Sequence, residues 1–248
     1  MEQIEDIRTY LKKLNLLYIN DKVDEFIASI NDIAHIKSLL KEECKSNEGR
    51  RTINRINLAH FPYTKRFEDY DYDFQKSVDQ AKIKKISTLE FISRNENIIF
   101  IGNPGTGKTH LATAIGIKAC EMNYSTHFTT LSDMINSLIR AKRNGKYRDK
   151  IGFYRRFKLL IIDEFGFNKL SEEESNILFE IISQRYELHS TIITTNIDFG
   201  EWTKTIGDTM LCSAIIDRLI HHSEIIKIIG PSYRTKDYIK RRDERLKQ

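Results

Sequence analysis

The stretch that decides the fold runs from residue 97 to residue 116 and reads NIIFIGNPGTGKTHLATAIG. It opens with a short aliphatic run, Ile98 to Ile101, which leads into a glycine-rich loop and then into a helix-forming run. The loop satisfies the pattern G-x-x-x-x-G-K-[ST], which indicates phosphate binding when a strand precedes it and a helix follows it. Because both flanks are present, the pattern predicts a P-loop rather than a chance match.

The residue types of this loop suit the binding of a phosphate chain. Glycines accept positive φ, so backbone N–H groups can turn inward, and the following helix presents its positive N-terminus to the same anion. Lys108 is expected to reach the β and γ phosphates, and Thr109 to offer its hydroxyl to Mg²⁺. The glycine spacing does not fit the G-x-G-x-x-G dinucleotide fingerprint. The predicted ATP-binding residues of the loop are Gly102, Asn103, Pro104, Gly105, Thr106, Gly107, Lys108 and Thr109.

A second stretch, residues 157–167, reads FKLLIIDEFGF and ends an aliphatic run with two adjacent acids, Asp163 and Glu164. Taken alone, the acids could mark the point where a buried strand meets water. Downstream of a P-loop, however, an acid at this place supplies the second Mg²⁺ contact, and a carboxylate just after it can polarise the water that attacks the γ phosphate. We therefore predict that Asp163 holds Mg²⁺ together with Thr109, and that Glu164 is the catalytic base.

The predicted reaction is ATP hydrolysis rather than phosphoryl transfer to a metabolite. A protein-kinase interpretation of the same stretch fails, because Glu164 separates Asp163 from Phe165 and Gly166, and no H-R-D catalytic loop precedes it. Lys108 joins Glu164 among the predicted catalytic residues, since it would contact the transferred phosphate.

Asn196 ends the fourth candidate strand, which is predicted near residues 190–195 in the stretch STIITTNIDF. In an open parallel sheet, ligands bind at the carboxyl ends of the strands, so Asn196 could stand near the γ phosphate and Glu164. There its amide could hydrogen-bond the attacking water or a phosphate oxygen. The alternative is that Asn196 caps the turn into the FGEW segment, and the residues alone leave both possibilities open.

Composition narrows the class of protein. The chain has 248 residues, of which 40% are hydrophobic, enough for a sizeable core. No aliphatic run is as long as a membrane span and the N-terminal residues are charged, so neither a transmembrane helix nor a signal peptide is expected. The three cysteines, Cys44, Cys120 and Cys212, are odd in number and widely separated, which fits buried thiols in a reducing cytoplasm. We predict a cytoplasmic protein.

The adjacent His221 and His222 could suggest a metal site. No companion cysteine, histidine or carboxylate stands at ligand spacing in the sequence, so a structural or nucleic-acid-facing role is favoured.

The chain falls into three regions. Residues 1–62 place aliphatic side chains at helical spacing and predict a small all-α domain. Residues 63–80 form a predicted linker, in which aromatic side chains among acids anchor it to the next domain; base stacking is disfavoured because the local charge is acidic. Residues 81–248 show an α/β pattern, and Ser171 with Glu174 predicts a capping box at the start of one helix. Strands are predicted near 98–101, 125–130, 159–163, 190–195 and 225–229.

Between the second and third predicted strands lies a strongly basic segment, IRAKRNGKYRDKIGFYRRFK. A solvated helix face normally mixes charges of both signs, whereas this segment has a large basic excess with Asp149 as its single acid. Such an excess suits binding to a phosphate backbone, and no base-reading motif accompanies it, so we predict sequence-independent DNA binding. The candidate DNA-binding residues are Arg140, Lys142, Arg143, Lys146, Arg148, Lys150, Arg155 and Arg156.

From about residue 67 to residue 238 the chain resembles the IstB/DnaC family of AAA+ ATPases. Within that family it is more similar to the IstB-like helper ATPases of insertion-sequence transposition than to the DnaC-type helicase loaders. The stretches that carry the resemblance are NIIFIGNPGTGKTHLATAIG, KLLIIDEFGF, LFEIISQRYELHSTIITTN, FGEW and IIDRLIHHSEIIKIIGPSYR.

The resemblance implies a fold and a partner set. It implies that residues 81–248 form an AAA+ P-loop domain with a five-stranded parallel sheet of order 5-1-4-3-2, and that residues 1–62 contact a partner. It also implies homo-oligomers that assemble in the ATP state on duplex DNA and help a transposase choose its target. A DnaC-type helicase loader, which would share the catalytic residues and bind a replicative helicase, is the alternative. No membrane partner is expected.

The resemblance also assigns roles to three residues. Asn196 looks like the first nucleotide sensor, and Arg234 is similar to a second nucleotide-sensing arginine. Arg218 falls where the family supplies an arginine finger to the γ phosphate of the neighbouring subunit. Its alternative, a surface pair with Asp217, is disfavoured because adjacent helical positions do not face each other.

Overall fold

The computed structural model describes residues 2–27 and 33–236. Contacts between Cα atoms divide the chain into two compact units, Met1–Arg55 and Ile56–Gln248. The helix α4 (Ile33–Leu58) begins in the first unit and ends in the second.

The first unit is all-helical, as the aliphatic spacing predicts. Before α4 it contains α1 (Glu2–Lys13), α2 (Leu17–Asp21) and α3 (Val23–Ile27). Its small core is built on Ile7, Leu11 and Val23, each at most 3% exposed. Because so few side chains are buried, these three contribute a large share of the stability of this unit.

The second unit is built on a five-stranded sheet whose order is β2-β3-β4-β1-β5. Read from the other edge, this is the predicted order 5-1-4-3-2, and the pairings along the sheet are parallel. The strands are β1 (Asn97–Gly102), β2 (Thr126–Thr130), β3 (Leu159–Phe165), β4 (Ser190–Thr195) and β5 (Ser223–Ile228).

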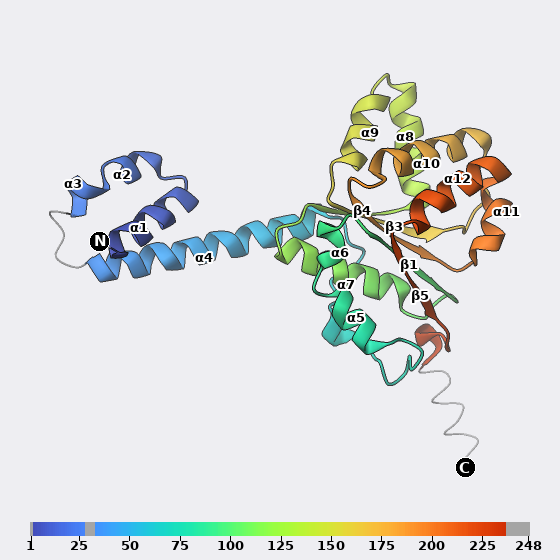
Figure 1. Cartoon of the computed structure of the whole chain (residues 1–248), viewed down its shortest axis with the longest axis horizontal. Helices are drawn as coiled ribbons and strands as arrows, with labels where there is room; N and C mark the ends of the chain where they lie inside the picture. The colour runs from blue at the N-terminus through green and yellow to red at the C-terminus, as the bar shows by residue number, and fades with distance from the viewer. Residues whose placement is uncertain (1, 28–32, 237–248) are drawn as a thin grey trace, which may run out of the picture. The chain divides into compact units, whose positions relative to one another are not determined.

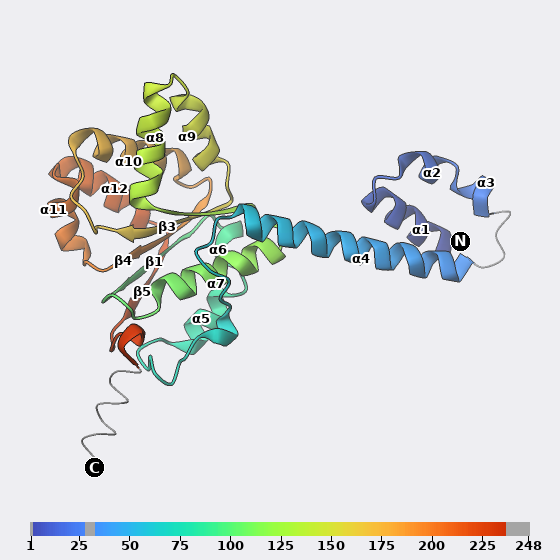
Figure 2. The same ribbon diagram turned by 180° about the vertical axis from the view of Figure 1, so that it is seen from behind.

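Helices cover both faces of this sheet (Figures 1 and 2). One face is covered by α5 (Gln80–Ile86), α6 (Glu90–Ser93) and α7 (Lys108–Glu121). The opposite face is covered by α8 (Leu131–Arg143), α9 (Tyr147–Arg155), α10 (Glu172–Arg185), α11 (Trp202–Ile206) and α12 (Thr209–Ile220). Short 3₁₀ turns, η1 (Phe67–Asp69), η2 (Phe199–Glu201) and η3 (Tyr233–Thr235), connect these elements.

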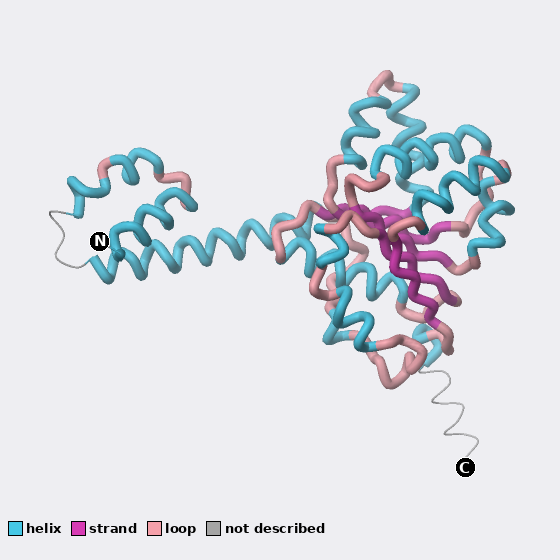
Figure 3. The backbone as a smooth tube through the Cα atoms, viewed as in Figure 1, coloured by secondary structure: helices cyan, strands magenta, loops and turns pink. Residues whose placement is uncertain are grey.

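The central strands β1, β3 and β4 are buried along most of their length because helices cover both faces, whereas β5 includes exposed residues. In β1, Ile98 and Phe100 pack under α5–α7, whereas Ile99 and Ile101 pack under α8–α12. Because β1, β3 and β4 pair in parallel, their carboxyl ends lie at one edge of the sheet, which is drawn in magenta in Figure 3.

The start of α10 confirms the predicted capping box. Ser171 accepts a hydrogen bond from the backbone N–H of Glu174, whose carboxylate accepts one from the N–H of Ser171. The N–H groups of Ser171 and Glu174, which have no backbone partner within the first turn of the helix, are both hydrogen-bonded in this way.

Within the described residues, no helix combines the length and the apolar composition that crossing a membrane requires.

Candidate nucleotide-binding site

The P-loop connects β1 to α7 through residues 103–107, and two of its glycines have positive φ. Gly105 has φ +80° and Gly107 has φ +95°. A Cβ atom on Gly105 would lie 2.0 Å from Oγ of Ser232, and one on Gly107 would lie 2.6 Å from the ring of Tyr70. Both conformation and space therefore require glycine here, and the loop forms a tight backbone cradle of the kind that binds phosphate.

Lys108 begins α7 and folds back over the loop. Its Nζ donates hydrogen bonds to the carbonyl oxygens of Gly102 at 2.7 Å and Asn103 at 2.9 Å, and the residue is 8% exposed. Burial lowers the pKa of the ammonium group, and the nearby Asp163 carboxylate partly offsets that shift. A cation held this close to the cradle can bind an entering phosphate at little cost in side-chain entropy.

Thr109 and Asp163 meet across the loop. The hydroxyl of Thr109 donates to the Asp163 carboxylate, with Oγ1 at 2.9 and 3.1 Å from the two oxygens, and Thr194 donates to the same carboxylate from β4. Asp163 is 6% exposed. A hydroxyl and a carboxylate are oxygen ligands that Mg²⁺ prefers, so these residues fit the ion that the P-loop motif implies.

Glu164 departs from the regular strand. Its φ is +59°, and the pairing of β3 with β4 shifts register between Ile162 and Phe165. Its backbone N–H donates to Thr194 Oγ1 at 3.3 Å. As a result Glu164 is exposed while Asp163 and Phe165 are buried, and a non-glycine residue in this conformation is characteristic of functional sites.

A cavity of about 260 Å³ collects most of the predicted site residues. Asn196 lies at its edge just beyond β4, and Arg234 lies in η3. Gly102 and Asn103 are connected to it through the hydrogen bonds of Lys108. The predicted residues that line the cavity are Pro104, Gly105, Thr106, Gly107, Lys108, Thr109, Asp163, Glu164, Asn196 and Arg234.

The segment before α5 also lines this cavity, which the sequence did not predict. The hydroxyl of Tyr70 donates to the Thr106 carbonyl at 3.1 Å, and its ring lies edge-on to His110 with centroids 5.3 Å apart. Gln75 is 2% exposed and donates through Nε2 to the Pro231 carbonyl at 2.6 Å. The crowding of aromatic residues in this segment signalled anchoring, but not that the anchor would be the P-loop.

The residues after β5 fasten onto the same loop. The Tyr233 N–H donates to the Gly105 carbonyl at 2.8 Å, and Lys236 forms an ion pair with Asp71. Arg234 is therefore held beside the cavity by contacts on both sides of it in sequence.

Arg218 is not brought into this cavity. It lies on α12, where Nη1 donates to the Ala214 carbonyl at 2.9 Å and the guanidinium lies 4.9 Å from the ring centroid of Phe179. Arg218 is not among the described residues that line the cavity.

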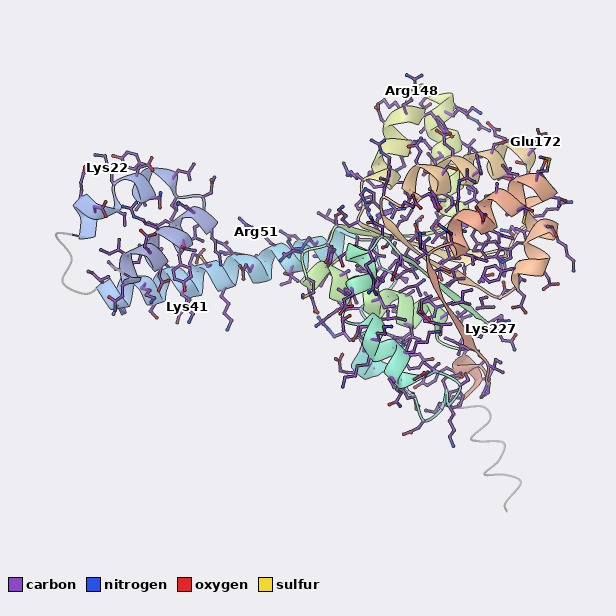
Figure 4. The ribbon with its side chains drawn as sticks, in the orientation of Figure 1. Lys22, Lys41, Arg51, Arg148, Glu172 and Lys227 are labelled. Atoms are coloured by element: carbon purple, nitrogen blue, oxygen red, sulfur yellow. The ribbon has the colours of Figure 1, made fainter. Side chains whose placement is uncertain are left out.

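The candidate DNA-binding residues lie on the helical hairpin formed by α8 and α9, which projects from the sheet (Figures 1 and 2). Arg148 lies at its outer end (Figure 4). Lys142 is paired with Glu173 at 2.6 Å, and Lys150 is half-buried with Nζ 4.3 Å from the ring centroid of Phe153. The exposed members are Arg140, Lys142, Arg143, Lys146, Arg148, Arg155 and Arg156.

The chain is similar in sequence to proteins that are named for ATP binding. A family model described as IstB-like ATP binding protein matches residues 16–241. A protein named for ATP binding from insertion sequence IS5376 of Geobacillus stearothermophilus is 39% identical over 94% of this chain and 95% of its own length. Its counterpart from insertion sequence IS232 of Bacillus thuringiensis is 36% identical over 98% of each chain.

Solved structures share the fold of the second unit. The DnaC helicase loader superposes with a TM-score of 0.55 at 22% identity, covering 70% of this chain and 98% of the loader. The replication initiator DnaA bound to AMPPCP and single-stranded DNA gives a TM-score of 0.59 at 19% identity, covering 75% of this chain and 56% of DnaA.

Proposed function

The chain belongs to the family of IstB-like ATP-binding proteins, and we propose that it is an ATPase that assembles on duplex DNA and directs a partner transposase to target sites. The observation that carries the hydrolytic part is the junction of β3 and β4, where Thr194 binds Asp163 and Glu164 at once. An ATP-binding protein without hydrolysis would not need the second carboxylate turned out of its strand.

In this proposal, the P-loop glycines and Lys108 bind the phosphate chain. Thr109 and Asp163 would hold Mg²⁺, which would neutralise charge on the β and γ phosphates when bound. Glu164 accepts a proton from the attacking water, and Asn196 orients that water or a phosphate oxygen. Glu164 is suited to this role because it is exposed to the cavity while its backbone is fixed by Thr194.

We assign DNA binding to the α8–α9 hairpin. Apart from the half-buried Lys150, its arginines and lysines are exposed, and the hairpin projects from the sheet, so they can follow a phosphate backbone without steric conflict with the nucleotide cavity. Affinity should fall steeply with salt, because each neutralised phosphate releases counterions. Alanine at Arg148 should reduce the salt slope by about one unit. Alanine at Lys142 should reduce it less, because Glu173 already pairs with that ammonium group.

Arg218 couples hydrolysis to assembly in this proposal. Because Arg218 does not line the cavity of its own chain, we assign it to the nucleotide of a neighbouring subunit, where an arginine finger contributes roughly 10³ to 10⁵ in rate in related NTPases. Hydrolysis would then require oligomers formed in the ATP state.

The test is an ATPase assay with and without duplex DNA on wild type, Arg218→Ala and Arg94→Ala. Arg94 is a surface arginine paired with Glu96 and serves as the matched control. Stimulation by DNA that only Arg218→Ala abolishes supports the proposal. No stimulation by DNA, together with an unaffected Arg218→Ala variant, would remove the assembly-coupled part.

A DnaC-type helicase loader remains the second candidate, because the loader shares the fold. The sequence relatives favour transposition, since they come from insertion sequences and match nearly the whole chain. Pull-down with the transposase of the same element, against pull-down with a replicative helicase, separates the two functions.

A further inference from the structure

One cluster of metal-ligating side chains lies outside the nucleotide cavity. Among the described residues, Glu187, His221 and His222 form a group whose ligand atoms all lie within 4.8 Å of one another. Glu187 follows α10, and the two histidines join α12 to β5. Sequence spacing hid this group, because the carboxylate stands more than thirty positions before the histidines.

The three side chains converge on one oxygen. Nδ1 of His221 lies 3.9 Å and Nε2 of His222 lies 3.8 Å from Oε1 of Glu187. Bonds of about 2.0–2.2 Å in a tetrahedral zinc site place ligand atoms roughly 3.3 Å apart. The two nitrogen–oxygen distances are therefore about half an ångström longer than in a filled site, and the ligand nitrogens of His221 and His222 lie within 4.8 Å of each other. Exposed side chains can close these gaps by rotation.

The backbone that carries these ligands is already fixed. The Asn95 amide donates to the Glu187 carbonyl at 2.9 Å, and the Asn97 N–H donates to the His222 carbonyl at 2.7 Å. Glu187 itself has φ +57°, which directs its side chain out of the turn after α10. Sites on fixed backbone lose little entropy when they bind a metal.

A further group stands next to the cluster. The hydroxyl of Tyr186 lies 2.8 Å from Nδ1 of His221. This is the nitrogen that faces Glu187, so the hydroxyl must give up its hydrogen bond when Nδ1 binds an ion, and water can occupy the remaining corner of the tetrahedron. Two imidazoles and a carboxylate are the donor set that proteins use for zinc when one position is left open.

We propose that Glu187, His221 and His222 form a zinc site that joins the turn after α10 to the turn before β5. The site lies at the amino ends of β4 and β5, whereas the P-loop lies at the carboxyl end of β1, so the length of a strand, roughly 17 Å, separates them. It is a second metal site, independent of the nucleotide and of the function proposed above.

The experiment titrates Zn²⁺ alone into the full chain against a chromophoric chelator. Wild type should bind one ion per chain at this site. Glu187→Gln, His221→Ala and His222→Ala should each lower zinc affinity at least about 100-fold, whereas Tyr186→Phe should not lower it, because the hydroxyl competes with zinc for Nδ1 of His221. Glu90→Gln, which alters an exposed glutamate elsewhere in the same unit, should leave it unchanged.

Two further measurements exclude other ligands. Asp163→Asn should retain zinc binding, because it alters the nucleotide cavity only. Co²⁺ bound in place of zinc should show no thiolate charge-transfer band, since the group contains no cysteine and Cys44, Cys120 and Cys212 are buried. The imidazole NMR signals of His221 and His222 should shift on addition of zinc.

Three results would overturn the proposal. They are the absence of stoichiometric binding, Glu187→Gln binding zinc as wild type does, and Asp163→Asn abolishing binding. The second would reduce the site to adventitious chelation by a histidine pair. All the substituted residues of the cluster are exposed, so each variant should fold, which circular dichroism checks.

Discussion

Thr194 offers a sharp test of how the two acids at the end of β3 are held. It is 2% exposed, and its single hydroxyl donates to the Asp163 carboxylate and accepts from the Glu164 N–H. Valine has nearly the same shape, so Thr194→Val removes both hydrogen bonds without opening a cavity. The variant therefore separates hydrogen bonding from packing.

The magnitude follows from the charge of the acceptor. A hydrogen bond to an ionised group contributes about 1.5–3 kcal/mol, roughly twice the value for a neutral pair. We expect Thr194→Val to lose about that amount of unfolding free energy. Because Thr109 still holds Asp163, the carboxylate should be misplaced rather than lost, and ATP turnover should fall about tenfold, equivalent to about 1.4 kcal/mol.

The assay combines urea denaturation with steady-state ATP hydrolysis, and Thr195→Val is the matched control. Thr195 is 1% exposed and its hydroxyl bonds the neutral backbone of Ile197 at 3.2 and 3.3 Å. Loss of the Thr195 hydroxyl should lower the free energy of unfolding by only about 0.5–1.5 kcal/mol. Equal effects of the two substitutions on stability and turnover would refute the special role of Thr194.

Two further predictions concern the packing beneath the α8–α9 hairpin. Burial, aided by the charges of His60, Lys150 and Arg156, lowers the pKa of His127 to about 4. The unfolded chain, with a histidine pKa near 6.5, then binds the proton more readily, so stability is complete above pH 6.5 and falls by about 1–3 kcal/mol as the pH drops toward 4. Urea unfolding at several pH values should show this, and His127→Gln should flatten the curve. Arg185 is 1% exposed and donates to the Tyr154 and Phe157 carbonyls at 2.9 Å each. Arg185→Met should lower the free energy of unfolding, measured by denaturant, by about 2–4 kcal/mol. Arg185→Lys should restore little of that loss, because lysine lacks the planar fork of donors.

The main features of the fold were predictable because they depend on local patterns. The aliphatic runs predicted the five strands, the resemblance to the IstB/DnaC family implied their order, and the helical spacing predicted the helices of the first unit. Boundaries were less accurate. β3 extends to Phe165 rather than 163, because the register shift at Asp163 and Glu164 lets the strand resume pairing at Phe165. β5 starts at Ser223 rather than 225, because pairing with β1 includes residues whose side chains are partly exposed.

The parts of the site that were not predicted depend on contacts distant in sequence. Tyr70 contacts the P-loop, and Gln75 contacts the residues after β5. Both contacts join positions far apart in the sequence, so no local pattern could predict them. The positive φ of Glu164 arises from pairing with β4, so the acid pair alone could not reveal it. Arg218, Arg234 and the division into residues 1–62, 63–80 and 81–248 remain predictions.

The measurement that tests the central claim most directly is ATP hydrolysis by Glu164→Gln, with retention on duplex DNA followed in parallel. Glu172→Gln, an exposed acid at the start of α10, is the control (Figure 4). We predict that Glu164→Gln binds ATP normally, hydrolyses it about 10² to 10⁴ times more slowly, and forms oligomers that persist on DNA, whereas Glu172→Gln behaves as wild type. A Glu164→Gln chain that hydrolyses ATP at the wild-type rate would contradict the assignment of Glu164 as the base and the ATP-driven cycle built on it.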